Sequence, residues 1–315
     1  MKAPLTLALI SGGISSERDV SLKSGDQVFA ALDKTKYRVR RYDPQTDLGR
    51  LVADAAAIDA ALIILHGTYG EDGTVQGLLD LLGIPYQGSG VLGSAVAMDK
   101  LVSKQLYAAS GIPTPSYITV ERKDENKADV CLEHIGLPLV VKPARGGSSI
   151  GMTIVKSQDK LEPAIDQALN YGDTLVVESY IAGTELTVGV IGNREITPLP
   201  VIEIIPDTRY EFFNYQAKYL PGASQEICPA RIDAALTEKA QSYAVMAHRA
   251  LYCEGYSRTD MILKDREIFV LETNTIPGMT ETSLLPRAAK TAGIPFPRLL
   301  DILIELGIER RPKRA

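Results

Sequence analysis

Arg258-Thr-Asp260 and Glu272-Thr-Asn274-Thr-Ile-Pro-Gly278-Met-Thr-Glu-Thr-Ser283-Leu284 flank two apolar runs, Met261-Ile-Leu263 and Ile268-Phe-Val-Leu271, around the polar turn Lys264-Asp-Arg-Glu267. This order predicts a β-hairpin. Because side chains alternate along a strand, Glu272 and Asn274 share one face, and a pairing without a bulge adds Arg258 and Asp260 to it. Oxygen ligands without His or Cys suit a hard cation such as magnesium, whose coordination shell substrate phosphates often complete. The alternative is a charged strand face in contact with solvent.

The composition is that of an ordinary soluble globular protein, with 45% hydrophobic and 23% charged residues. A length of 315 residues is enough for two or three packed units. The net charge of -5 gives no electrostatic grip on nucleic acid or on an anionic membrane. The cysteines are far apart, so neither a disulfide framework nor a zinc site is expected. The first apolar run is too short for a signal peptide and no segment could span a membrane, so we expect a cytoplasmic protein.

The chain order predicts three units. In residues 1–88, strand-like runs alternate with helical patterns, which indicates an N-terminal parallel α/β substrate domain. Residues 89–180 begin with a helix whose apolar residues span 98–109 and continue as a small α+β unit with a glycine-rich loop. Residues 181–315 are mostly strands, with one helix that carries an apolar stripe across residues 236–251.

The segment 205–225 follows neither the strand nor the helix period. It contains five aromatic residues within ten positions, and Lys218 lies among them. A long irregular segment so rich in aromatic side chains indicates a packed functional loop rather than a disordered linker.

Two lysines are candidates for phosphate contacts. Lys142 ends a strand and precedes the turn Gly146-Gly147-Ser148-Ser149, whose small residues let backbone amides approach a phosphate closely. The spacing is not that of a P-loop, and a loop between two strands favours a hairpin lid over a nucleotide. A hairpin turn with structural glycines is the alternative. Lys100 stands at the start of a helix, where a phosphate would meet free backbone amides, although a surface lysine fits this position equally well.

Glu178 ends a further strand and is followed by the linker Ser179-Tyr180-Ile181. A strand that runs into an exposed linker can hydrogen-bond a purine edge, and Glu185 could reach a ribose. A plain turn between domains would have the same pattern.

The N-terminal loop after Gly12-Gly13 occupies the place of a dinucleotide-binding loop, but the G-x-G-x-x-G pattern is missing. Glu17 would repel a pyrophosphate, so it better suits a cation such as a substrate ammonium group. Alternatively, Glu17 and Asp19 only complement a helix dipole. His66 ends a buried strand at the same edge and is either a structural histidine or a substrate contact.

Together these motifs resemble the ATP-grasp superfamily and, within it, the D-alanine–D-alanine ligases. The motifs that carry the resemblance extend over nearly the whole chain in order: Gly12-Gly13 to Ser21, His66-Gly67-Thr68 to Gly73, Met98-Asp99-Lys100, Val141-Lys142-Pro143 to Ser149, Glu178, Ala217-Lys218-Tyr219, Arg258-Thr259-Asp260, and Glu272 to Thr280. The resemblance implies an ATP-grasp fold of α/β and α+β class, with an N-terminal parallel α/β (pre-ATP-grasp) domain.

The resemblance also implies a nucleotide and metal site. The phosphates would be held by Lys100, Lys142 and Lys218, with Ser148 and Ser149 in the glycine-rich loop. Adenosine would lie against Glu178, Tyr180, Ile181 and Glu185. Asp260, Glu272 and Asn274 would bind two magnesium ions (Mg2+) or Mn2+.

The same resemblance implies an amino-acid site. Glu17, with His66 nearby, would hold the ammonium group of the first D-alanine, and Ser148 and Tyr219 would hydrogen-bond to Glu17. Arg258 and the Gly278 amide would stabilise an oxyanion. Ser283 and Leu284 would bind the second carboxylate.

The implied activity is the ATP-dependent ligation of two D-alanines to D-alanyl-D-alanine through an acyl phosphate, for peptidoglycan precursors, by a cytoplasmic homodimer. Tyr219 favours an amine acceptor over D-lactate. Open alternatives are a sibling ligase that takes D-serine or D-lactate, and a nucleotide-binding regulator without activity. A dehydrogenase would leave Lys142 and the acidic hairpin unexplained.

Overall fold

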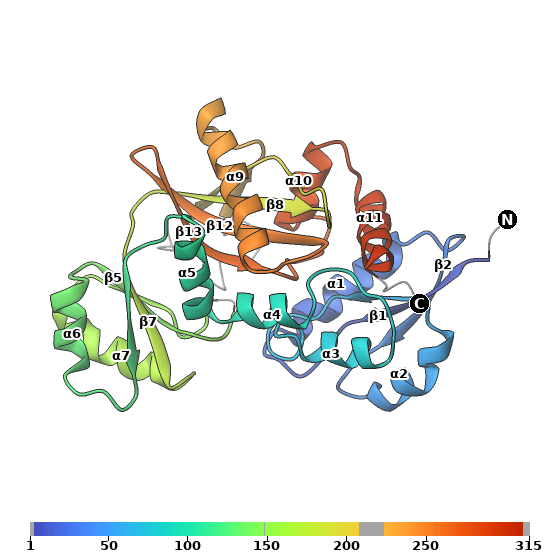
Figure 1. The fold of residues 1–315 in the computed structure, drawn as a ribbon, viewed down its shortest axis with the longest axis horizontal. Helices are drawn as coiled ribbons and strands as arrows, with labels where there is room; N and C mark the ends of the chain where they lie inside the picture. Colours follow the sequence, from blue (N-terminus) through green and yellow to red (C-terminus); the bar gives the residue numbers. More distant parts are fainter. Residues whose placement is uncertain (1–2, 148, 208–223, 311–315) are drawn as a thin grey trace.

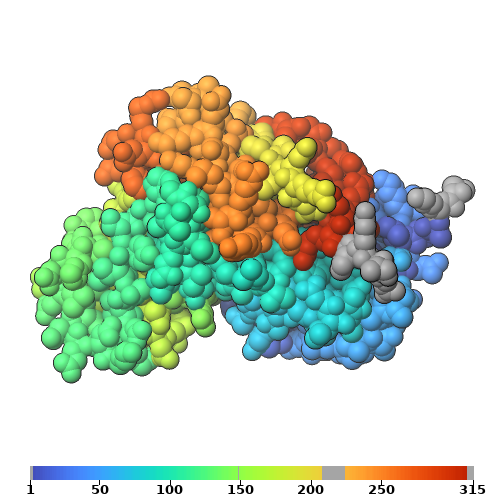
Figure 2. Space-filling model, viewed as in Figure 1, coloured from blue at the N-terminus to red at the C-terminus, as the bar shows by residue number. Residues whose placement is uncertain are grey.

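The computed structural model describes residues 3–147, 149–207 and 224–310. Within these ranges the strands form three sheets, of three, six and four strands. The lobe of the four-stranded sheet and the N-terminal lobe lie at opposite ends of the molecule, and the six-stranded sheet with its helices lies between and above them (Figure 1 and Figure 2). This arrangement confirms the predicted α/β and α+β class with a parallel N-terminal sheet.

The N-terminal sheet is parallel, in the order β2 (Tyr37–Tyr42), β1 (Leu5–Ile10) and β3 (Ala60–Ile63). Successive side chains of β1 and β3 point alternately to the two faces of the sheet and so enter two different cores. One core lies beside α1 (Arg18–Ala31), and the other lies beside α2 (Leu48–Asp54) and α3 (Thr74–Leu81). A short 3-10 helix, Ala55–Ala57, follows α2. Burial on both faces explains why β3 is apolar at every position.

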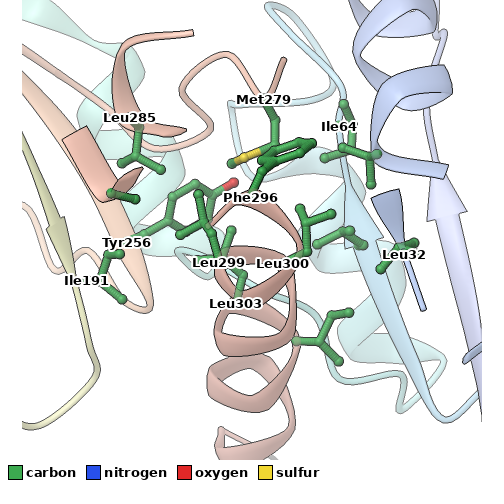
Figure 3. Close-up of a cluster of buried hydrophobic side chains, with 14 of the residues drawn as sticks. Leu32, Ile64, Ile191, Tyr256, Met279, Leu285, Phe296, Leu299, Leu300 and Leu303 are labelled. Carbon is green, nitrogen blue, oxygen red and sulfur yellow. The ribbon is translucent and has the colours of Figure 1, made fainter. Parts of the chain in front are cut away.

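The C-terminal helices return to this sheet. Helix α10 (Leu284–Thr291) is followed by α11 (Phe296–Glu309), whose Leu299, Leu300 and Leu303 lie among side chains of the N-terminal lobe and of the six-stranded sheet (Figure 3). The cluster includes Leu32 and Ile64 from the N-terminal lobe, together with Ile191 and Tyr256 from the six-stranded sheet. The buried apolar face of α11 therefore fixes the N-terminal sheet relative to the six-stranded sheet. The domain boundaries at residues 88 and 180 stay a prediction.

The helix predicted across residues 98–109 is wrong in one respect, because Met98 belongs to a separate preceding helix. Helix α4 (Val91–Met98) ends before Asp99, and α5 (Lys100–Ala109) begins after it. Asp99 has extended backbone angles, and its side chain accepts hydrogen bonds from the backbone N–H groups of Leu101 and Val102. This N-cap interrupts the helix and places Lys100 in the first turn of α5.

The four-stranded sheet has the order β4 (Tyr117–Glu121), β7 (Thr174–Ser179), β5 (Leu139–Pro143) and β6 (Thr153–Val155), and all pairs are antiparallel. Helices α6 (Lys127–His134) and α7 (Leu161–Leu169) pack against one face of it (Figure 1), and the 3-10 helix Gln158–Lys160 precedes α7. Side chains of the opposite face, among them Lys142 and Glu178, line the pocket described below.

The six-stranded sheet has the order β11 (Ser224–Ile227), β10 (Ile202–Pro206), β8 (Thr184–Ile191), β12 (Tyr256–Lys264) and β13 (Glu267–Asn274), with β9 (Thr197–Pro198) paired to β8. Helix α9 (Ala234–Ala250) buries Leu236, Ala240, Ala244 and Ala247 against one face, as its apolar stripe predicts. No helix in the described ranges has the length and apolar character needed to cross a bilayer.

Candidate active site

A pocket of about 480 Å³ lies between the four-stranded and the six-stranded sheet. Its volume is in the usual range for small-molecule sites. Its walls come from the uncovered face of β5 and β7, the glycine-rich loop, the linker after β7 and strands β8, β10, β12 and β13. Nine predicted site residues line it: Lys100, Lys142, Ser149, Glu178, Tyr180, Ile181, Glu185, Asp260 and Glu272.

The acidic hairpin forms one wall. Strands β12 and β13 are joined by Asp265 and Arg266, which both have positive φ, as in the tight turns typical of hairpins. Arg258 pairs with Asn274 and Asp260 with Glu272, and the β-bulge comes only after Asp260. Residues directly opposite one another share a face. The four side chains therefore project from the same face, as predicted for a pairing without a bulge between them.

The carboxylate of Asp260 is the centre of this face. Arg258 Nε lies 2.8 Å from Asp260 Oδ1 and Arg258 Nη2 lies 2.7 Å from Oδ2. Asn274 Nδ2 donates to Asp260 Oδ2 over 3.2 Å, and the Thr187 hydroxyl donates to Oδ1 over 2.6 Å. Two carboxylates and an amide oxygen, all partly buried, are donors suited to a hard cation. Nowhere in the described ranges do three or more His, Cys, Asp or Glu side chains form a metal-binding group.

Lys142 lies on the opposite wall and is paired with a buried carboxylate. Lys142 Nζ is 2.6 Å from Glu178 Oε1, and Lys104 Nζ is 3.0 Å from the same atom. Burial would raise the pKa of Glu178, but the ammonium groups of Lys142 and Lys104 lower it, and the lowering is the larger effect. Glu178 is therefore an anion at neutral pH. Burial lowers the pKa of Lys104 to about 8, so this side chain keeps its positive charge at pH 7.

The glycine-rich loop connects the two lysines. The Lys100 ammonium donates to the Gly146 carbonyl oxygen, and the Lys100 backbone N–H donates to Ala144 O over 2.8 Å. Arg145 Nε contacts the N-cap Asp99 over 2.9 Å. Helix α5 is thus joined to the loop after β5 at several points. Lys100 and Lys142 are brought to one pocket because the start of α5 and the end of β5 adjoin each other.

The predicted amino-acid residues Glu17 and His66 lie together in the N-terminal lobe, and both are buried. A β-carbon added to Gly67 would lie 2.9 Å from Glu17 Oε2, and one added to Gly147 would lie 3.7 Å from the same atom. Burial lowers the pKa of His66, although the Glu17 carboxylate opposes this effect. Within the described residues, His66 Nε2 has no hydrogen-bond partner. The Glu17 carboxylate therefore lies beside both the His66 loop and the glycine-rich loop.

Gly278 and Ser283 are neighbours at the start of α10. The Ser283 hydroxyl accepts a hydrogen bond from the Thr280 backbone N–H over 3.1 Å, and it does not cap the helix. A β-carbon at Gly278 would lie 3.0 Å from this hydroxyl. Leu284 is the first residue of α10, where backbone N–H groups lack helical partners and favour a carboxylate. The geometry is compatible with the roles that the resemblance implies for these residues.

Three predicted site residues, Ser148, Lys218 and Tyr219, lie outside the described residues. The predicted aromatic loop across residues 205–225 falls largely outside them as well. The two ends of this segment differ from the prediction of an irregular loop, because Ile205 and Pro206 belong to β10 and pair antiparallel with Gln225 and Ser224 of β11.

The structure adds to the vicinity of the site three residues to which the sequence analysis assigns no role. Lys104 is fully buried against Glu178, and Thr187 donates to Asp260. Glu71 accepts from the Gly67 backbone N–H over 2.7 Å, and burial, with the nearby carboxylates of Glu17 and Glu272, raises its pKa to about 8. A signal for Lys104 was present, since it follows Lys100 by one helical turn. Its partner on β7 could not be identified from spacing alone.

Known proteins provide independent findings. The family profile "D-ala D-ala ligase C-terminus" matches residues 106–305, and "D-ala D-ala ligase N-terminus" matches residues 43–89. The chain is 60% identical over 305 residues to a D-alanine–D-alanine ligase of Syntrophobacter fumaroxidans. The aligned region covers 97% of this chain and 98% of the relative. It is 54% identical over 308 residues to that of Desulfotalea psychrophila, covering 97% and 96% of the two chains.

Solved structures agree with these sequence matches. The fold superposes with a TM-score of 0.84 on a D-alanine–D-alanine ligase from Bacillus anthracis complexed with ATP, at 37% identity and 98% coverage of both chains. It also matches a VanG D-Ala:D-Ser ligase from Enterococcus faecalis, with a TM-score of 0.83, 33% identity and coverage of 96% and 99%. The sequence matches over nearly full length and the shared fold confirm the predicted resemblance. The chain belongs to the D-alanine–D-alanine ligase family of the ATP-grasp superfamily.

Proposed function

We propose that this protein uses ATP to join two D-alanine molecules into D-alanyl-D-alanine, a precursor for peptidoglycan. The observation that carries the proposal is the pocket between the two sheets, whose walls include Lys100 and Lys142 as well as Asp260 and Glu272. Cationic groups for phosphates and oxygen donors for a hard cation are the two requirements of a site that activates a carboxylate with ATP.

The nucleotide part of the proposal assigns adenosine to the linker after β7. Glu178, Tyr180 and Ile181 line one part of the pocket, and Glu185 enters it from β8. Lys100 and Lys142 would then contact the phosphates, and the amides of the glycine-rich loop would cover them. Roles for Ser148, Lys218 and Tyr219 at the phosphates and over the site stay predictions.

The metal part of the proposal assigns magnesium, or manganese, to Asp260, Glu272 and Asn274. The donor set fits, because its oxygen atoms share one strand face beside the proposed phosphate contacts. Thr187 and Arg258 donate hydrogen bonds to the Asp260 carboxylate, so this proposed metal ligand is held in place. A bound divalent ion would supply positive charge that neutralises the phosphate oxygens.

The reaction follows from these contacts. A carboxylate oxygen of the first D-alanine attacks the γ-phosphorus of ATP, and ADP leaves, which converts a poor leaving group into an acyl phosphate. Glu17 holds the ammonium group of this D-alanine, with His66 nearby. The amine of the second D-alanine then attacks the acyl carbon, the tetrahedral oxyanion is stabilised by Arg258 and the Gly278 N–H, and phosphate leaves. Ser283 and Leu284 hold the second carboxylate at the start of α10.

A second candidate is a sibling ligase with a different acceptor. The favouring observation is the VanG D-Ala:D-Ser ligase, which shares the fold at a TM-score of 0.83. The two candidates have the same nucleotide and metal site and differ only in the amine or alcohol that attacks. A catalytically inactive regulator is less consistent with the site, because it would have no need for the complete acidic hairpin and both lysines.

Phosphate release tests the proposal. The protein is incubated with ATP and magnesium, either without an amino acid or with D-alanine, D-serine plus D-alanine, or D-lactate plus D-alanine, and the products are identified by mass spectrometry. We expect ATP turnover only with an amino acid present, with D-alanyl-D-alanine as the main product near neutral pH. Absence of this dipeptide would refute the proposal, and a mixed product in excess would replace it with the sibling activity.

We also propose that the enzyme works in the cytoplasm, where ATP is available, and that it is a homodimer. The dimer rests only on the family resemblance. Sedimentation equilibrium of the full chain tests it, and a mass of one protomer, 34.1 kDa, at micromolar concentration would contradict it.

A further inference from the structure

Lys104 is a fully buried lysine whose side chain has no place in the reaction described above. It lies on α5 with 0% of its surface exposed, and it does not line the pocket. Placing an ammonium group in a protein interior costs several kcal/mol unless an opposite charge compensates for it. An apolar side chain of similar length would fill the same space at a lower cost. The presence of a charge at this position therefore requires a reason.

The compensating charge is Glu178. Lys104 Nζ lies 3.0 Å from Glu178 Oε1, and the ring of Tyr117 on β4 has its centre 5.1 Å from the same ammonium. Glu178 is 2% exposed, and its other partner is Lys142, whose Nζ lies 2.6 Å from the same oxygen. One carboxylate oxygen is thus shared by two lysines that approach it from two different elements, α5 and β5.

Only one of the two lysines reaches the pocket. Lys142 lines it and is the proposed phosphate contact, whereas Lys104 lies outside it. With both lysines charged, the group carries two positive charges and one negative charge, a net charge of +1. Without Lys104, Glu178 would neutralise Lys142 and the net charge would be zero. An ammonium group that is neutralised by a buried carboxylate attracts a phosphate much less strongly.

We infer that Lys104 is a positioning residue of the nucleotide site. It shares the Glu178 carboxylate with Lys142 from outside the pocket, so that Glu178 stays oriented toward the nucleotide and the three-residue group presents a net positive charge to a phosphate through Lys142. This inference rests on the proposed function, since it assumes that the pocket binds ATP. It adds a residue that touches neither substrate and that acts only through Glu178.

The first test compares wild type with Lys104→Met, which keeps the length of the side chain and removes its charge. We expect KM for ATP and the dissociation constant for ADP, measured by calorimetry, to rise about tenfold or more, while KM for D-alanine stays within about twofold. Ser103→Ala is the matched control. Ser103 is buried next to Lys104 on α5, and its hydroxyl donates to Val96 O over 2.9 Å, so this variant loosens the same helix without altering charge.

The second test asks whether Lys104 acts through Glu178. Lys104→Met should lower the affinity for ADP much less in the Glu178→Gln background than in wild type, because no carboxylate is left there to neutralise Lys142. Additive losses would overturn the inference. Glu178→Gln and the double variant differ only at Lys104, so a difference of about tenfold in ADP affinity between them would overturn the inference even if Lys104→Met alone does not fold.

The outcomes separate the inference from the function on which it rests. If wild type makes no dipeptide, the proposed function fails, and the ADP titrations still report on Lys104. If wild type is active and Lys104→Met only lowers Tm, with KM for ATP and the affinity for ADP unchanged, the proposed function stands and the inference is refuted. A loss in Ser103→Ala equal to that in Lys104→Met would refute it as well.

Discussion

The Lys142 ammonium is both a proposed phosphate contact and an ion-pair partner of Glu178. Replacing Lys142 with alanine should separate its effect on activity from its effect on stability. The side chain is 8% exposed, its Nζ lies 2.6 Å from Glu178 Oε1, and it lines the pocket. A charge-assisted contact to a phosphate in such a site contributes about 3 kcal/mol to the transition state, so kcat/KM for ATP should fall about 150-fold. Lys104 still contacts Glu178 in the variant, so the loss of unfolding free energy should stay near 1–3 kcal/mol.

Steady-state ADP release with D-alanine and magnesium measures the first effect, and thermal unfolding of the same samples measures the second. Lys160→Ala is the matched control, because the Lys160 side chain is 72% exposed and lies at the start of α7. It should leave both quantities unchanged. A folded Lys142→Ala variant whose kcat/KM is within about threefold of wild type would remove Lys142 from the phosphate site.

Three further substitutions test the proposed magnesium ligand Glu272, the proposed ammonium-binding residue Glu17, and the ion pair between Asp43 and Arg18. Glu272→Gln removes one of two proposed carboxylate ligands, so half-maximal activity should need about tenfold more magnesium, and an unchanged titration would contradict the assignment. Glu17→Gln should raise KM for D-alanine and leave KM for ATP within about twofold, whereas equal rises would place Glu17 outside the amino-acid site. Burial would raise the pKa of Asp43, but hydrogen bonds from Arg18 and the Gly13 N–H lower it below 3.8. Its stabilising effect is therefore present above this pH and is lost as the pH falls through the folded-state pKa. Asp43→Asn should lower Tm by about 2–4 °C at pH 7 and by less at pH 3, and an equal drop at both would refute the ion-pair explanation.

The hairpin could be predicted from sequence because its information is local. Apolar runs of strand length around a short polar turn fix the pairing, and the two-residue period then decides that Asp260 and Glu272 share a face. The bulge after Asp260 could not be predicted, but it lies beyond the residues that matter for the metal site. The boundaries of helices were harder to predict from sequence. The apolar period continues across Asp99, and only the capping bonds to Leu101 and Val102 show where α5 begins.

Lys104 illustrates the other limit of sequence reasoning. At the level of the helix it is one more charged residue in an amphipathic segment, for which exposure to solvent is the ordinary expectation. Its burial follows from contacts with Glu178 on β7, 74 residues further along the chain, and with Tyr117 on β4. A long-range ion pair of this kind leaves no local pattern, because either partner alone looks like a surface charge. The residues proposed to contact substrate are thus easier to recognise than those proposed to hold them in place.

The position of Glu17 suggests how the two halves of the reaction meet. A β-carbon added to Gly67 in the N-terminal lobe would lie 2.9 Å from its carboxylate, and one added to Gly147 in the glycine-rich loop of the four-stranded sheet would lie 3.7 Å from it. An ammonium group bound there would be held next to the loop proposed to cover the phosphates. The carboxylate of the same D-alanine is bonded directly to the carbon that bears this ammonium, so it would lie close to the proposed position of the γ-phosphate. Binding of the first substrate would therefore supply much of the approach that phosphoryl transfer requires, because the attacking oxygen is positioned before the reaction begins. Since Glu17 and the glycine-rich loop belong to different lobes, a change in their relative placement would act on the rate of acyl-phosphate formation even if every contact to ATP were preserved.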